Sequence, residues 1–194
     1  MNEQQNGGPL DFRTAMGWLA FICRSMAVSV EVILHENFGI RYLGLQAAAA
    51  AAFIFFYAGS WQGYDPQPMF SYFGLYLFGC FVHSTEARRC AKRGGPQPHS
   101  YYTGRPLIMR LTGRRFSEIT IKRFIEPMMV FVIGAMVAKG SEPLGKFLML
   151  AAAGLLASVN LSVNYEETRA RDMNDAAINA RQAAERFRDM HGDR

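Results

Sequence analysis

Long stretches without charged residues constrain this chain more than any other feature. Residues 42–64, 69–84 and 147–165 contain no Asp, Glu, Lys or Arg, and charged residues make up only 19% of the chain, against roughly 25% in soluble domains. The first stretch reaches the length of about 20 residues that a membrane-spanning helix needs. The pattern excludes a disordered chain and a small disulfide-rich domain. It predicts an all-α, polytopic integral membrane protein.

The apolar stretches predict a membrane helical domain over residues 11–164, preceded by a flexible tail over residues 1–10 and followed by a polar C-terminal helix over residues 165–194. Four spans are expected, together with a charged N-terminal helix embedded in or against them. The segment Pro127–Ala138 rises only about 18 Å, so whether it crosses the bilayer fully stays open. The expected helices cover residues 11–35, 42–61, 69–84, 117–138 and 144–164.

A strongly basic segment separates the third and fourth predicted spans. Between Thr85 and Arg123, ten Lys or Arg residues are opposed only by Glu86 and Glu118, so the segment carries +8. Basic loops between spans lie on the cytoplasmic side. We therefore expect a cytoplasmic loop over residues 85–116, a cytoplasmic C-terminus and a location in the bacterial inner membrane, whereas the side of the N-terminus stays open.

The basic residues of this segment are also expected to form a patch for anionic lipid or for a protein partner. Aromatic residues among them, such as Tyr102 and Phe116, would also suit nucleic acid, but Leu107, Ile108 and Met109 favour insertion into a lipid surface. Nucleic acid is therefore not an expected partner. The patch residues are Arg88, Arg89, Lys92, Arg93, Arg105, Arg110, Arg114, Arg115, Lys122 and Arg123.

Charged residues inside the first apolar segment are the most informative about chemistry. Arg24, Glu31 and His35 recur at spacings of seven and four and so fall on one narrow stripe of a helix. An ion in the bilayer interior costs at least about 2.5–3.5 kcal/mol, so these side chains need partners or water. A structural ion pair that locks helix packing is the favoured interpretation. A proton or ion pathway and a contact to another subunit are the alternatives.

Other residues with chemical potential carry weaker signals. Glu126, beside Pro127, is a candidate membrane-interface carboxylate that would pair with Lys122 at i,i+4. The residues Cys80, His83, Cys90 and His99 follow no zinc spacing. A haem held by His35 and His83 would need ligands that face each other at the same depth. No metal and no cofactor is expected, and three cysteines define no disulfide framework.

The polar C-terminal segment carries a heptad pattern of small and apolar residues. A helix that binds a partner or another copy of the chain and a merely solvated helix are equally compatible with this short, alanine-rich seam. In the last span, Gly154 and Ser158 form a small-residue pair suited to close helix packing. The seam residues are Ala170, Met173, Ala177, Ala180, Ala184 and Phe187.

No nucleotide-binding loop, serine-hydrolase elbow, HExxH metal motif or dinucleotide fingerprint occurs in the sequence. The favoured function is therefore a non-enzymatic inner-membrane subunit or scaffold of a larger assembly, such as a secretion, transfer or energy-transducing complex. A small proton- or ion-coupled transporter that uses Arg24, Glu31 and His35 is the alternative. A membrane enzyme that acts on lipid at the basic loop is the third candidate.

Overall fold

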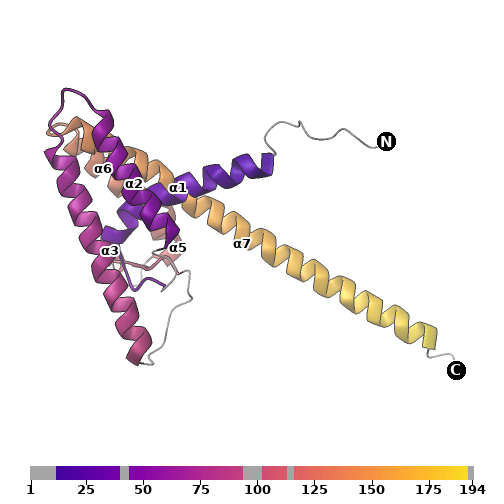
Figure 1. Cartoon of the computed structure of the whole chain (residues 1–194). Helices are drawn as coiled ribbons and strands as arrows, with labels where there is room; N and C mark the ends of the chain where they lie inside the picture. Colours follow the sequence, from indigo (N-terminus) through magenta and orange to yellow (C-terminus); the bar gives the residue numbers. More distant parts are fainter. Residues whose placement is uncertain (1–11, 40–43, 94–101, 113–115, 192–194) are drawn as a thin grey trace, which may run out of the picture. The chain divides into compact units, whose positions relative to one another are not determined.

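The computed structural model describes residues 12–39, 44–93, 102–112 and 116–191, and over these residues the protein is all-α (Figure 1). The expected tail over residues 1–10 lies outside this part of the chain. The structure divides into two compact units at Val159, the second of which begins at Asn160. The long helices are α1 (Phe12–Leu34), α2 (Leu45–Ser60), α3 (Gln67–Arg93), α6 (Glu126–Val137) and α7 (Glu142–His191).

Small residues let the helices of the first unit pack closely. Helix α1 packs against both α2 and α3, and Figure 1 shows α2 and α3 running antiparallel. The alanine run of α2 buries Ala47 and Ala50, and the Tyr76 hydroxyl donates to the Ala47 carbonyl at 2.9 Å. A Cβ on Gly79 of α3 would lie 2.7 Å from the Val32 side chain of α1. Glycine is therefore required for this approach.

Helix α7 makes two further close contacts through small residues. A Cβ on Gly145 would lie 2.4 Å from the Ala138 backbone. Because glycine has no Cβ, α6 and α7 can form a tight hairpin here. A Cβ on Gly154 would lie 2.8 Å from Cβ of Met26 in α1. The prediction that Gly154 and Ser158 form a packing face is confirmed, because Ser158 is buried and hydrogen-bonded to α1.

A short two-stranded antiparallel sheet attaches the basic segment to the end of α1. Strand β1 (His35–Glu36) pairs with β2 (Arg105–Pro106), with His35 opposite Pro106. Just before β2, Gly104 has a φ of +83°, and a Cβ there would lie 2.9 Å from the Glu36 carbonyl and from His35. Only glycine suits this position. The short helix α4 (Ile108–Thr112) follows.

The helix preceding α6 changes character along its length. Helix α5 (Glu118–Thr120) is capped by Ser117, because the Ser117 hydroxyl accepts from the Thr120 amide at 3.1 Å. It continues as the π-helical segment η2 (Ile121–Ile125), where the Glu126 amide donates to the Ile121 carbonyl. Pro127 follows at once and has no amide hydrogen, which interrupts regular α-helical bonding at this point.

Two expected boundaries differ from the structure. Helix α3 continues through Arg93 rather than ending at residue 84, so part of the expected loop over residues 85–116 is helical. Ala87, Arg88, Arg89 and Lys92 favour helix, and no glycine or proline intervenes before residue 94. Likewise, the expected helices 144–164 and 165–194 form one continuous helix, α7, because no residue between them stops it.

Two helices of the described chain are long and apolar enough to cross a membrane: Thr14–Leu34 and the helix from Glu142 to Arg188. Helix α2 is apolar but shorter, with 16 residues. Of the four expected spans, only the last passes this test, and the charged N-terminal helix passes as well. The structure therefore supports an all-α protein with two candidate spans and does not by itself establish the four-span arrangement.

Candidate functional site

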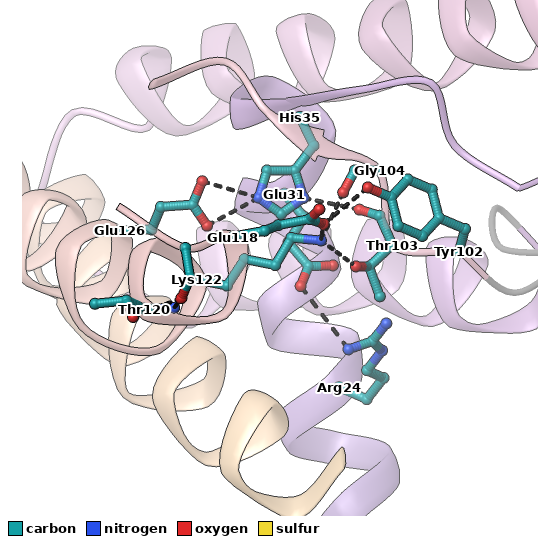
Figure 2. A network of polar contacts seen from close by, with 11 residues as sticks. Arg24, Glu31, His35, Tyr102, Thr103, Gly104, Glu118, Thr120, Lys122 and Glu126 are labelled. Carbon is teal, nitrogen blue, oxygen red and sulfur yellow. Dashed lines mark hydrogen bonds and ion pairs between the residues drawn. The ribbon is translucent and has the colours of Figure 1, made fainter. Parts of the chain in front are cut away.

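A cluster of charged side chains lies in the interior of the first unit (Figure 2). Glu31, His35 and Glu126 each have only 1% of their surface exposed. Glu31 lies in α1, on the stripe that the helical spacing indicates. His35 follows the last residue of α1 and is the first residue of β1. Because burying an ionised group without partners is costly, the contacts of each member determine what the cluster can do.

The lower part of the cluster, as Figure 2 shows it, joins Arg24 to Glu31. Arg24 Nη1 lies 3.8 Å from Glu31 Oε1 and donates to Ser158 Oγ of α7 at 2.9 Å. Seven residues of helix separate the two charges by about 10 Å along the axis, so the long arginine side chain closes the gap. Arg24 therefore ties the stripe of α1 to the small-residue face of α7.

The upper part of the cluster is the pair formed by His35 and Glu126. His35 Nε2 lies 2.9 Å from Oε2 and 3.0 Å from Oε1 of Glu126. The other ring nitrogen, Nδ1, lies 2.8 Å from the Thr103 carbonyl oxygen. A carbonyl oxygen only accepts hydrogen bonds, so Nδ1 must carry a hydrogen. The contact at Nε2 then needs one further proton, placed between the imidazole and the carboxylate.

Glu126 does not form the expected pair with Lys122. Lys122 instead donates to Glu118 Oε1 and the Gly104 carbonyl at 2.6 Å each, and to Thr103 Oγ1 at 2.9 Å. The π-helical segment between Lys122 and Glu126 changes their angular spacing relative to a regular α-helix. As a result Glu126 is fully buried beside His35, rather than lying at an interface as predicted.

Electrostatics around Lys122 tie the basic segment to α5. The Tyr102 hydroxyl donates to Glu118 Oε1 at 2.8 Å, and the Lys122 ammonium lies 4.9 Å from the centre of the Tyr102 ring. Burial and the hydrogen bond to Glu118 raise the pKa of Tyr102 above its usual range. Burial also raises the pKa of Glu118, but the hydrogen bonds from Lys122 and Tyr102 outweigh it, so this pKa lies below its usual value.

The predicted basic patch is divided among different environments. Lys122 belongs to the interior cluster, Arg110 pairs with Glu36, and Arg123 lies over the Phe124 ring at 5.4 Å. Arg88, Arg89, Lys92 and Arg105 are exposed. The side chain of Arg93 and the residues Arg114 and Arg115 lie outside the described part. Lys122 is therefore not part of an exposed surface, and the role of the exposed residues as a binding patch stays a prediction.

The described residues contain no group of three or more His, Cys, Asp or Glu that could hold a metal ion. Cys80 is half-buried, Cys90 is exposed, and His99 lies outside the described residues. Both ring nitrogens of His35 are already engaged, and Nε2 of His83 donates to the Val32 carbonyl at 3.0 Å. Haem ligation by His35 and His83 would have to break these bonds.

The second unit begins at Asn160, and its described residues, through His191, form one helix. All six residues of the predicted seam (Ala170, Met173, Ala177, Ala180, Ala184 and Phe187) are exposed on it. Among the larger apolar residues, 59% of Met173 and 62% of Phe187 are exposed. The seam is thus accessible within this unit, and its role as a partner face stays a prediction.

Sequence reasoning did not find every member of the cluster. Glu118 was noted only as one of two acids in the basic segment, and Ser158 only as a small packing residue. Thr103, which contacts His35 through its backbone carbonyl and Lys122 through its hydroxyl, was not singled out in the sequence. No family model, no curated protein and no solved structure matches this chain. A functional interpretation therefore rests on the geometry alone.

Proposed function

We propose that this protein is a non-enzymatic, polytopic membrane subunit that serves as a scaffold in a larger assembly and presents its C-terminal helix to a protein partner. The observation that carries the proposal is the exposure of large apolar residues on helices whose interior holds paired charges beside an apolar core. Charged residues pair with one another in the interior of the first unit, whereas large apolar residues cover the outside of its helices.

The exposed apolar residues support a membrane environment. Soluble monomers rarely expose large contiguous apolar surfaces, but a lipid bilayer is the natural solvent for such faces. The faces lie on helices that do not meet the combined length and apolarity test for spanning as well as on those that do. Exposed residues of this kind include Phe55 and Phe56 on α2, Leu75, Phe78 and Phe81 on α3, and Met128, Phe131, Val132 and Met136 on α6.

The four-span arrangement is part of this proposal. The uncharged part of α3 rises about 24 Å, and η2 with α6 adds a similar length, against a hydrocarbon thickness of about 30 Å. Lysine and arginine side chains at the ends can reach the head groups. The orientation follows from the basic segment, which would lie in the cytoplasm together with the C-terminus. The membrane would be the bacterial inner membrane.

A structural role for the interior cluster supports a scaffold rather than a catalyst. Arg24, Glu31, His35, Lys122 and Glu126 all have partners, and those partners come from α1, β1, α5, α6, α7 and the segment before β2. Such pairing joins segments that are far apart in sequence. The rigid body that results would leave the exposed C-terminal helix as the part that meets a partner.

A proton- or ion-coupled transporter is the second candidate, favoured by one specific observation. Two carboxylates, Glu31 and Glu126, and the imidazole of His35 are buried together within apolar helices. Buried ionisable residues of membrane segments often mark proton pathways. Proton-coupled flux in liposomes that disappears in Glu31→Gln would place the transporter above the scaffold.

The scaffold proposal is tested by placing charges on and beside the seam. The double variant Ala177→Glu/Ala184→Glu charges the seam, and Ala176→Glu/Ala183→Glu adds the same charges to the adjacent alanines, one position away around the helix. Partners that co-purify with the full chain from native membranes should be lost, at least tenfold by quantitative mass spectrometry, only from the seam variant. Equal recovery of every partner by both variants and by a chain lacking residues 166–194 would contradict the proposal.

A further inference from the structure

We propose that His35 and Glu126 form a proton-binding site, and that the proton bound there holds η2 and α6 against the end of α1. This inference goes beyond the scaffold function, because it assigns a ligand and a controllable state to the interior cluster. The Thr103 carbonyl oxygen lies 2.8 Å from Nδ1 of His35 and can only accept, so Nδ1 carries a hydrogen. With that hydrogen in place, the contact between Nε2 and the Glu126 carboxylate depends on a second one.

The site has two states that differ by one proton. In the occupied state Nε2–H donates to the Glu126 carboxylate, and both groups are satisfied. In the empty state the proton has left for water, and the Nε2 lone pair faces two carboxylate oxygens at about 3 Å. Both groups are 99% buried, so no water relieves the repulsion while the contact stays closed. Loss of the proton and separation of Glu126 from His35 are therefore linked.

The charges around the pair favour the occupied state. Within the described cluster, the two cations Arg24 and Lys122 oppose three carboxylates, those of Glu31, Glu118 and Glu126. One proton on the pair makes the cluster neutral. The outer neighbours form separate contacts: Glu36 pairs with Arg110, His83 lies 3.7 Å from Glu86, Tyr102 donates to Glu118, and Arg105 is exposed.

The backbone hydrogen bonding of the segment that carries Glu126 allows a local rearrangement. Glu126 follows the π-helical η2 directly, and Pro127 supplies no amide to hold the next turn. Short π-helical segments occur mainly at functional sites and are less favourable than the α-helix. A change of η2 toward α-helical bonding would turn Glu126 away from His35 without unfolding α6. Proton release is therefore expected to loosen residues 121–126 and leave the rest of the unit in place.

The first test reads the proton directly. The full-length protein, labelled with ¹⁵N-histidine in nanodiscs, contains four histidines, and single His83→Gln, His99→Gln and His191→Gln variants assign the remaining signal to His35. At a pH below the range in which the protection of η2 falls, we expect the imidazolium pattern, with hydrogens on both nitrogens. A neutral ring with its hydrogen on Nε2 would overturn the proposal, because Nδ1 could not then donate to Thr103. A neutral ring with its hydrogen on Nδ1 would also overturn it, unless Glu126 is protonated in the infrared carboxyl band.

The second test reads the coupling to η2 by hydrogen–deuterium exchange. Between the pH at which the separated groups lose the proton and the higher pH at which the closed pair loses it, protection of residues 121–126 relative to α2 should fall about tenfold per pH unit, the slope for one proton. Stability is thus present at lower pH and lost as pH rises. In Glu126→Gln the amide donates to neutral Nε2 without an added proton, so the contact persists and its pH dependence disappears. The surface variant Glu142→Gln should behave as the wild type.

Each result of the exchange experiment decides the question. A pH-independent ratio of η2 to α2 protection in the wild type would overturn the coupling, as would an unchanged slope in Glu126→Gln. If Glu126→Gln does not fold, the wild-type slope and the ¹⁵N spectrum still decide. These outcomes do not depend on the identity of the partner of the C-terminal helix.

Discussion

Lys122 and Glu126 lie four residues apart in the chain but do not pair with each other. Lys122 donates to Glu118 at 2.6 Å, while Glu126 lies 2.9 Å from His35 in a different part of the interior. The π-helical turn between them gives the two side chains different partners, whereas a regular helix would let them pair with each other. Lys122 holds the segment before β2, and Glu126 joins α6 to α1.

The first prediction concerns Arg24 and Glu31. Removing one partner of a buried ion pair costs roughly 3–5 kcal/mol, whereas removing both can be nearly neutral. Arg24→Leu and Glu31→Leu should therefore each lower the stability of the protein in detergent, and the double variant should recover much of the loss. A double-mutant cycle by thermal unfolding measures the coupling. The exposed pair of Glu142 and Lys146 is the matched control and should show no measurable coupling. Strict additivity for Arg24 and Glu31 would mean that they do not interact.

The second prediction separates steric crowding from backbone strain at Gly104. Gly104 and Gly63 have φ values of +83° and +82°, but only at Gly104 would a Cβ meet other atoms within 4 Å. Gly63→Ala should cost about 1–2 kcal/mol for the left-handed backbone. Gly104→Ala should cost clearly more, because it pushes β2 away from His35. Thermal unfolding of both variants measures the difference. Equal costs would show that the β1–β2 contact is looser than the structure indicates.

The third prediction follows from the lowered pKa of Glu118. A carboxylate whose pKa is lower in the folded state stabilises the fold above its unfolded pKa of about 4.3. This contribution is lost as pH falls through the folded value. The difference in unfolding temperature between wild type and Glu118→Gln should therefore narrow between about pH 6 and about pH 3. A gap that stays constant or widens on acidification would contradict the assignment of Lys122 and Tyr102 as the stabilising partners.

The fourth prediction concerns topology, on which the scaffold proposal depends. In a cysteine-free background, Gly95→Cys and Glu185→Cys should resist a membrane-impermeant thiol reagent in intact cells and react after lysis. Gln62→Cys, in the turn between α2 and α3, is the control expected to react in intact cells. The +8 segment predicts this orientation through the excess of Lys and Arg on the cytoplasmic side. Labelling of residues 95 and 185 but not residue 62 would reverse the orientation.

Several boundaries show why a sequence predicts helices better than their ends. The expected range 42–61 corresponds to Leu45–Ser60. Gly44 precedes the first residue of this helix, and Trp61 after its last residue is in an extended conformation. The range 69–84 was too short, since the change from apolar to basic residues marks a change of environment rather than the end of a helix. The change near residue 165 lies within the continuous helix α7 for the same reason.

The spacing of Arg24, Glu31 and His35 is sufficient to predict that they share one stripe, because the helical period places residues seven and four apart on the same face. The sequence also indicates that these residues need partners, since charge in an apolar segment is costly. Their partners, in contrast, could be identified only from the folded structure. Ser158, Thr103 and Glu126 lie 134, 68 and 91 residues away from the side chains they contact. Such contacts depend on close helix packing, on a glycine turn and on a π-helical turn, and their combined geometry exists only once the chain has folded.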